Sequence, residues 1–156
     1  MDGVAGELSR LVGEKHVLVG DAIGPEYTHD ESLTVAAVTP HAVVRPGSVD
    51  EVSKVLAFAN ARRIPVVARG AGTGLSGAAT PVKDGIVLSL ERLSRIVEID
   101  EENQVAVCEP YVRLAELYAA AEAKGLMYAI MPGENSATVG GTVATNAGGM
   151  QAVKYG

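Results

Sequence analysis

The sequence is poor in cysteine, aromatic residues and long apolar runs. Its 156 residues include one cysteine, one phenylalanine and no tryptophan. Cys108 cannot form a disulfide within the chain, which argues against a small secreted domain stabilised by disulfides. No apolar run approaches the roughly 18–20 residues of a membrane-spanning helix, and the first residues lack the pattern of a secretory signal. We therefore expect a cytoplasmic protein without a transmembrane segment.

Metal ligands and positive charge are also scarce. The three histidines, His16, His29 and His41, do not have the spacing of a metal site, so we expect no bound metal. The formal net charge is −6, from 13 basic and 19 acidic side chains. An acidic chain with few aromatic residues does not favour nucleic acid as a partner. Hydrophobic residues make up 47% of the chain, which excludes a disordered protein.

Glycine, by contrast, is abundant. The chain has 18 glycines, well above the average frequency of about 7%. Four lie in residues 70–77 and five in residues 133–149. Each glycine increases the entropy lost on folding, so such clusters indicate places where the backbone turns sharply or is approached closely.

An α+β fold is predicted from the pattern that begins near residue 41. Residues 42–45 and 65–68 are predicted strands, and the apolar stripe in residues 52–59 predicts a helix between them. Ser48 and Glu51 have the spacing of a capping box, in which the Ser48 hydroxyl accepts from the Glu51 N–H and the Glu51 carboxylate from the Ser48 N–H. This order of elements is a βαβ unit.

Outside the βαβ unit, the sequence predicts individual elements of secondary structure. We expect residues 1–40 to form an N-terminal arm that is mostly loop, with a short helix at residues 4–12. No element is expected to close the chain at its C-terminal end. The other predicted elements are a strand at 85–90, an antiparallel pair at 95–99 and 104–108, a helix around 114–121 ended by Gly125, and a helical turn at 139–144.

The first glycine cluster follows a predicted strand directly. Successive N–H groups of such bare backbone can turn toward one point and bind the anionic oxygens of a phosphate or pyrophosphate. Residues 72–77 also match the G-x-G-x-x-G pattern of Rossmann dinucleotide sites. That site requires a helix to begin at once, and Pro81 would break such a helix. An NAD-binding Rossmann-type dehydrogenase fragment stays an alternative, which predicts a helix directly after Gly77.

The second cluster again combines glycines with small hydroxyl residues. Two such loops about sixty residues apart indicate a ligand long enough to be held along its length, such as a dinucleotide. The alternative outside enzymes is a non-catalytic module that uses this surface to pair with another subunit. It predicts a concentration-dependent dimer and no stabilisation by a nucleotide.

Both clusters resemble the flavin loops of FAD-linked oxidases that have a PCMH-type (vanillyl-alcohol-oxidase-type) FAD-binding domain. The resemblance is carried by residues 65–77 (PVVARGAGTGLSG) and 138–149 (TVGGTVATNAGG), and residues 43–52 and 153–156 fit it as well. It covers about residues 27–156 and is closest to the branch of the glycolate oxidase D-subunit and D-lactate dehydrogenase.

The resemblance implies a domain of two small α/β subdomains over residues 41–156, truncated at its C-terminus. The family oxidises 2-hydroxy acids by hydride transfer from the substrate Cα to flavin N5, with iron–sulfur or other electron-transfer subunits as partners that can hold it at the inner membrane. Because the first loop has no histidine, we expect FAD to be bound noncovalently. The catalytic residues would lie beyond Gly156, so we expect the chain to be inactive alone.

The resemblance also implies which residues bind the cofactor. In the family, the first loop wraps the pyrophosphate and the second runs along the rest of FAD. By position, the first loop contributes Gly70, Ala71, Gly72, Thr73, Gly74, Leu75 and Ser76, and the second contributes Pro132, Gly133, Ser136, Thr138, Gly140, Gly141, Thr145, Asn146, Gly148 and Gly149.

Other polar residues are expected to lie outside the site. His29 and Asp30 are adjacent on an extended segment, so their side chains point to opposite sides, and we expect both to be surface residues. Glu134 is expected to face away, because a carboxylate repels pyrophosphate. Tyr111 and Arg113 depart from the family pattern of glycine and threonine before the second helix, and an arginine side chain cannot accept as an N-cap.

Overall fold

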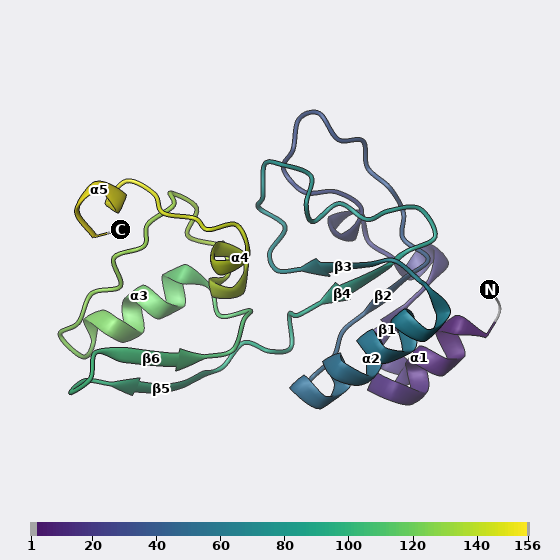
Figure 1. Cartoon of the computed structure of the whole chain (residues 1–156), viewed down its shortest axis with the longest axis horizontal. Coiled ribbons are helices and arrows are strands. Elements are labelled where there is room, and N and C mark those ends of the chain that lie inside the picture. Colours follow the sequence, from purple (N-terminus) through teal and green to yellow (C-terminus); the bar gives the residue numbers. More distant parts are fainter. Residues whose placement is uncertain (1–2, 156) are drawn as a thin grey trace. The chain divides into compact units, whose positions relative to one another are not determined.

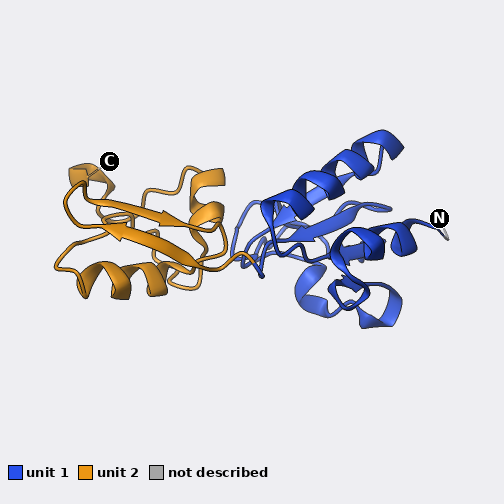
Figure 2. Ribbon diagram, turned by 90° about the horizontal axis from the view of Figure 1, so that it is seen from below, with its two compact units in different colours: residues 1–92 blue, residues 93–156 orange. Residues whose placement is uncertain are grey.

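A computed structural model describes residues 3–155 and divides the chain into two units, residues 1–92 and 93–156 (Figure 2). The predicted α+β class is confirmed, because both units combine helices with strands. Within residues 3–155, none of the helices has the length and apolar character needed to span a bilayer. The predicted boundary after residue 40 stays a prediction.

The first unit is built on a four-stranded sheet in the order β1-β2-β4-β3 (Figure 1). Strands β2 (Ala42–Val44), β4 (Ile86–Ser89) and β3 (Val66–Arg69) are parallel, and β1 (Val17–Leu18) is antiparallel to β2. The predicted strand–helix–strand order is present, but β4 lies between its two strands. All four residues of β4 are buried, as expected for a central parallel strand.

Two helices complete the core of the first unit. Helix α1 (Val4–Val12) and helix α2 (Val49–Arg62) bury apolar side chains in one cluster with β2 and β4. The short helix predicted at residues 4–12 is therefore present, and it packs in the core. Between α1 and β2 lie three 3₁₀ turns: η1 (Glu14–His16), η2 (Gly20–Ala22) and η3 (Pro25–Tyr27).

The start of α2 confirms half of the predicted capping box. The Ser48 hydroxyl accepts from the Glu51 N–H at 3.1 Å, as expected. The Glu51 carboxylate, however, accepts from the Gly47 N–H at 2.7 Å rather than from Ser48. The Glu51 carboxylate therefore binds the backbone N–H of the residue before the N-cap Ser48, not that of Ser48 itself.

Within residues 93–155, the second unit contains an antiparallel hairpin and three helices. Strands β5 (Ile96–Asp100) and β6 (Val105–Cys108) pair as predicted, with an irregularity between Ile96 and Glu98. Helix α3 (Leu114–Glu122) buries Leu114, Leu117 and Ala121 and runs beside the hairpin (Figure 1). The predicted turn is helix α4 (Val139–Ala144), whereas α5 (Ala152–Tyr155), near the end of the chain, was not expected.

Candidate functional site

The first glycine loop, residues 70–80, begins at the carboxyl end of β3. Ligands of parallel sheets bind at this edge. The described backbone has a turn at Ala78 and Ala79 and no helix between Gly77 and β4. The helix that the NAD-binding alternative requires is therefore absent, and that alternative is wrong.

The N–H groups of residues 70–76 donate to no acceptor within residues 3–155. Within this run, Ala71, Gly72, Thr73 and Gly74 are only partly exposed, so their amides are incompletely hydrated. A row of unused amide donors fits an anionic ligand such as a phosphate or pyrophosphate.

The structure explains the presence of glycine differently at different positions of the loop. Gly72 and Gly77 both have φ of +79°, which disfavours other residues. A Cβ at Gly72 would collide with the Arg69 guanidinium, and one at Gly77 would meet the Val35 side chain. A Cβ at Gly74 would lie 3.7 Å from Asp30 Oδ2, an ordinary contact. Protein packing thus explains Gly72 and Gly77 but does not require glycine at position 74.

Asp30 lies behind this loop, and the prediction that it is a surface residue is wrong. It is only 4% exposed. Its carboxylate accepts hydrogen bonds from the Ser32 N–H at 3.0 Å, the Ala79 N–H at 3.3 Å and the Thr80 hydroxyl at 3.3 Å. Burial by itself raises the pKa of Asp30, but these bonds and one from the Gly77 N–H together outweigh burial and lower it. Sequence alone missed Asp30 because its partners lie about fifty residues away.

Arg69 places a buried positive charge beside the same loop. It is 6% exposed, and its Nη1 donates to the carbonyl oxygens of His29 at 2.8 Å and Ala79 at 3.2 Å. The guanidinium also lies against Gly72. A cation at this position favours an anion on the loop, because charges interact more strongly away from bulk water.

The second predicted loop, residues 132–149, lies in the second unit and includes α4. The first N–H groups of α4 already have acceptors, so this helix start has no unused donors for a ligand. This holds for Gly140 and Gly141, two of the predicted cofactor residues. The bonds run from Val139 to Val112 O at 2.9 Å, from Gly140 to Pro110 O at 2.8 Å and from Gly141 to Thr138 Oγ1 at 3.2 Å.

Two glycines of this loop are required by close backbone contacts. Gly149 has φ of +94°, and a Cβ there would collide with the carbonyl of Met131. A Cβ at Gly140 would lie 2.7 Å from Pro110 Cβ. Gly133 has φ of +97° and open space around it. The second loop is therefore shaped largely by its own packing.

The departures from the family pattern are accommodated locally. The Arg113 N–H donates to the Glu116 carboxylate at 3.1 Å, a bond that needs only the backbone of residue 113. The Tyr111 N–H donates to Leu93 O at 2.8 Å. Glu134 is exposed and accepts from the Ser136 N–H at 2.8 Å. Its orientation toward a cofactor stays a prediction.

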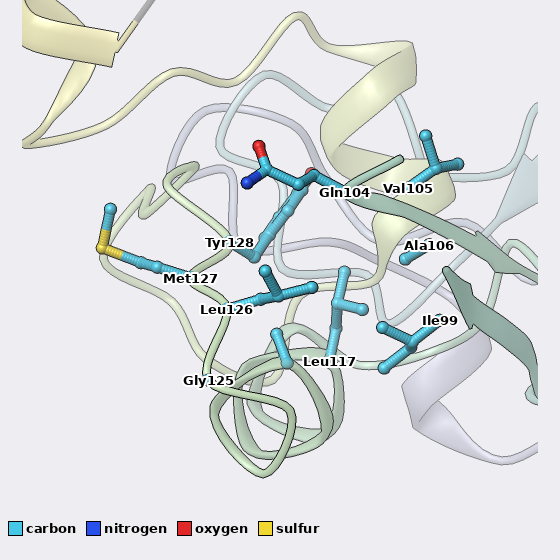
Figure 3. A pocket seen from close by; sticks show the side chains of 10 residues that line it. Ile99, Gln104, Val105, Ala106, Leu117, Gly125, Leu126, Met127 and Tyr128 are labelled. Atoms are coloured by element: carbon cyan, nitrogen blue, oxygen red, sulfur yellow. The ribbon is translucent and has the colours of Figure 1, made fainter. Parts of the chain in front are cut away.

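The second unit also has a hollow of about 360 Å³ beside α3 and the hairpin (Figure 3). Ile99, Leu117 and Leu126 point into it, and Tyr128 lies at its side. None of its lining residues belongs to the two predicted flavin loops. Because those loops lie in separate units, their convergence on one cofactor also stays a prediction.

Comparison with known proteins identifies the family. The model of a family described as an FAD binding domain matches residues 40–156. The chain is 47% identical over 156 residues to an uncharacterized FAD-linked oxidoreductase of Mycobacterium tuberculosis, covering all of this chain and 34% of that protein. It is 49% identical over 135 residues to a D-lactate dehydrogenase of Archaeoglobus fulgidus, covering 83% of this chain and 30% of that protein.

A glycolate oxidase subunit of Bacillus subtilis is 40% identical over 131 residues, covering 83% of this chain and 28% of the subunit. The fold matches a solved alkyldihydroxyacetonephosphate synthase with a TM-score of 0.88 at 20% identity, covering all of this chain and 31% of that one. The chain thus spans about a third of the length of the relatives it matches.

These findings confirm the resemblance stated from the sequence, including its glycolate oxidase and D-lactate dehydrogenase branch. The relatives are FAD-linked oxidoreductases, and FAD is the cofactor of this kind of domain. The unused amides of the first loop fit the pyrophosphate of that cofactor. The chain belongs to the FAD binding domain family.

Proposed function

We propose that this chain forms the N-terminal part of an FAD-dependent enzyme that oxidises a 2-hydroxy acid of the glycolate or D-lactate type. The observation that carries the proposal is the row of unused N–H groups at Ala71, Gly72, Thr73 and Gly74, next to buried Arg69. Relatives named D-lactate dehydrogenase and glycolate oxidase subunit support the substrate class.

In this proposal, residues 70–76 hold the FAD pyrophosphate. The unused amides donate to its oxygens, and Arg69 adds a positive charge behind them. In the second unit, the predicted residues from Pro132 to Gly149 contact the rest of the cofactor, while the amides of Gly140 and Gly141 are already used within the protein. FAD supplies the two-electron oxidation, and the protein supplies binding and orientation.

The same proposal includes the mode of binding and the partners. Binding is noncovalent, because residues 70–77 contain no histidine. The substrate is a small hydroxy acid, and electrons leave through an iron–sulfur or other electron-transfer subunit in the cytoplasm or at the inner membrane. The substrate site lies in the part of the longer relatives that this chain does not span.

Thermal unfolding with FAD, FMN and NAD tests the cofactor. A ligand present at about 100 times its Kd adds about 2.7 kcal/mol to the free energy of unfolding. We expect FAD to raise the Tm and NAD to leave it unchanged. A shift with NAD alone would contradict the proposal, and a concentration-dependent dimer without any nucleotide shift would favour the interaction module.

A turnover assay tests the incomplete site. The purified 156-residue chain with added FAD is expected not to oxidise glycolate or D-lactate, because the proposal places the substrate site outside residues 1–156. Measurable turnover would show that the substrate site lies within this chain.

A further inference from the structure

A short N-terminal segment, residues 28–32, contacts the middle and the end of the first glycine loop. This segment precedes the region that the FAD binding domain family model matches, which begins at residue 40. The Glu31 N–H donates to Gly74 O at 2.9 Å, in the middle of the loop. Asp30 binds the end of the loop through the Ala79 N–H and the Thr80 hydroxyl.

The loop has little structure of its own to hold this shape. Within the described chain, residues 70–80 close one backbone hydrogen bond on themselves, from the Thr80 N–H to Gly77 O at 3.1 Å. The other hydrogen bonds that hold the loop come from segment 28–32 and from Arg69. The Arg69 guanidinium donates to both His29 O and Ala79 O. The shape of the loop therefore depends on residues about fifty positions away.

Asp30 is the centre of these contacts. A buried carboxylate is costly unless hydrogen bonds compensate it, and here the backbone N–H of Asp30 donates to Thr80 Oγ1 while its two oxygens accept from the loop and from Ser32. These bonds use the N–H groups at the end of the loop. The N–H groups of residues 71–74, at its beginning, stay unused.

We infer that Asp30 is a positioning residue for the cofactor, which fixes the shape in which residues 71–74 present their N–H groups to the FAD pyrophosphate. This inference rests on the proposed role of the loop. Asp30 does not touch the cofactor in this assignment. It acts through Ala79, Thr80 and Gly77.

The first test measures the Kd for FAD and for ADP in the 156-residue chain. Asp30→Asn keeps the size of the side chain but places an amide where the carboxylate accepts hydrogen bonds, and we expect it to weaken both ligands about tenfold. Thr80→Val, which removes one hydroxyl partner, should weaken them in the same direction by less. Asp21→Asn makes the same charge change at an exposed residue and should leave both Kd values unchanged.

A second control separates positioning from general stability. Val55 is fully buried on α2 in the core of the first unit. Val55→Ala should lower the Tm while the Kd for FAD, measured well below both unfolding transitions, stays that of the wild type. If Val55→Ala weakens FAD as much as Asp30→Asn does, or if Asp30→Asn binds FAD like the wild type, the inference is overturned.

A nucleotide-free measurement distinguishes failure of this inference from failure of the proposed function. The ¹⁵N heteronuclear NOE of Gly72, Gly74 and Gly77 reports fast motion of the loop in the chain without FAD. Asp30→Asn should lower these values, whereas Asp21→Asn should not. If the wild type binds no FAD, the function fails but this result still decides whether Asp30 orders the loop. Unchanged NOE values in Asp30→Asn would overturn the inference.

Discussion

The Tyr27 hydroxyl donates a hydrogen bond of 2.7 Å to the Glu91 carboxylate, 64 residues further along the chain. Glu91 also accepts from the Ser89 hydroxyl at 2.9 Å and from Arg45 Nη1 at 3.2 Å. Tyr27 is 8% exposed, and burial together with the bond to Glu91 raises its pKa to about 12. The bond anchors the segment that precedes Asp30 to the residues after β4.

Replacing Tyr27 with phenylalanine is expected to destabilise the first unit. The ring would stay packed, but Glu91 would lose one of its donors, at a cost of about 1–2 kcal/mol in the free energy of unfolding. Urea denaturation at neutral pH measures this change. Tyr155→Phe, at an exposed position of α5, is the matched control. Equal stability of Tyr27→Phe and wild type would contradict the expectation.

Because of Tyr27, we also expect the protein to lose stability at alkaline pH. Its pKa in the folded state, about 12, lies above its ordinary value of 10.0, so folding favours the neutral hydroxyl. This contribution is fully present below about pH 10 and is lost as the pH rises through about 12. Between these values Tyr27→Phe should lose less stability than the wild type. Parallel curves of unfolding free energy against pH would rule this out.

We expect Asp30 to have the opposite effect, a loss of stability at acid pH. Hydrogen bonds lower its pKa in the folded state, so it stabilises the fold above the unfolded-state pKa of about 3.9. That contribution disappears as the pH falls through the lower, folded-state value. Asp30→Asn should therefore show a shallower acid destabilisation than the wild type below about pH 4. Acid unfolding followed by circular dichroism measures the slope, and equal slopes in Asp30→Asn and the wild type would contradict this expectation.

Gly72 and Gly74 form a matched pair in the first loop. Gly72→Ala places a Cβ against Arg69 at a left-handed backbone position and is expected to cost about 1–2 kcal/mol of stability. Gly74→Ala has room within the protein and should keep the wild-type Tm. Because this Cβ would lie on the side of Asp30, behind the loop, the variant should also keep the wild-type affinity for FAD. A weaker affinity of Gly74→Ala for FAD at unchanged Tm would show that the cofactor approaches the loop from the side of Asp30.

Gly149 and Gly133 form a second pair, in the second unit. Both have positive φ, but only Gly149 lies against backbone, the Met131 carbonyl. Gly149→Ala is expected to cost roughly 3 kcal/mol or more, because both the strain and the collision must be relieved. Gly133→Ala should cost about 1 kcal/mol from strain alone. Chemical denaturation of both variants checks the order, and equal losses would show that residues 131 and 149 are not in contact.

Elements with strong local signals were predicted well from the sequence. The Ser48 cap, the apolar stripe of α2 and the turn between β5 and β6 all arise from interactions within a few residues. The position of β4 between β2 and β3 was not predicted, because strand order depends on which strand buries both faces. Asp30 was misassigned for the same reason, since its burial depends on the distant loop.

The sequence by itself determined the α+β class and the two glycine loops, because glycine spacing and apolar periodicity are local properties of the chain. The FAD-binding family followed from the resemblance of these loops to the flavin loops of known FAD-linked oxidases. Only the tertiary structure decided which backbone donors remain available: those of Ala71 to Gly74 are unused, whereas those of Gly140 and Gly141 are taken by Pro110 and Thr138. Whether an N–H group is available depends on which distant acceptors folding brings beside it, and no local pattern encodes that.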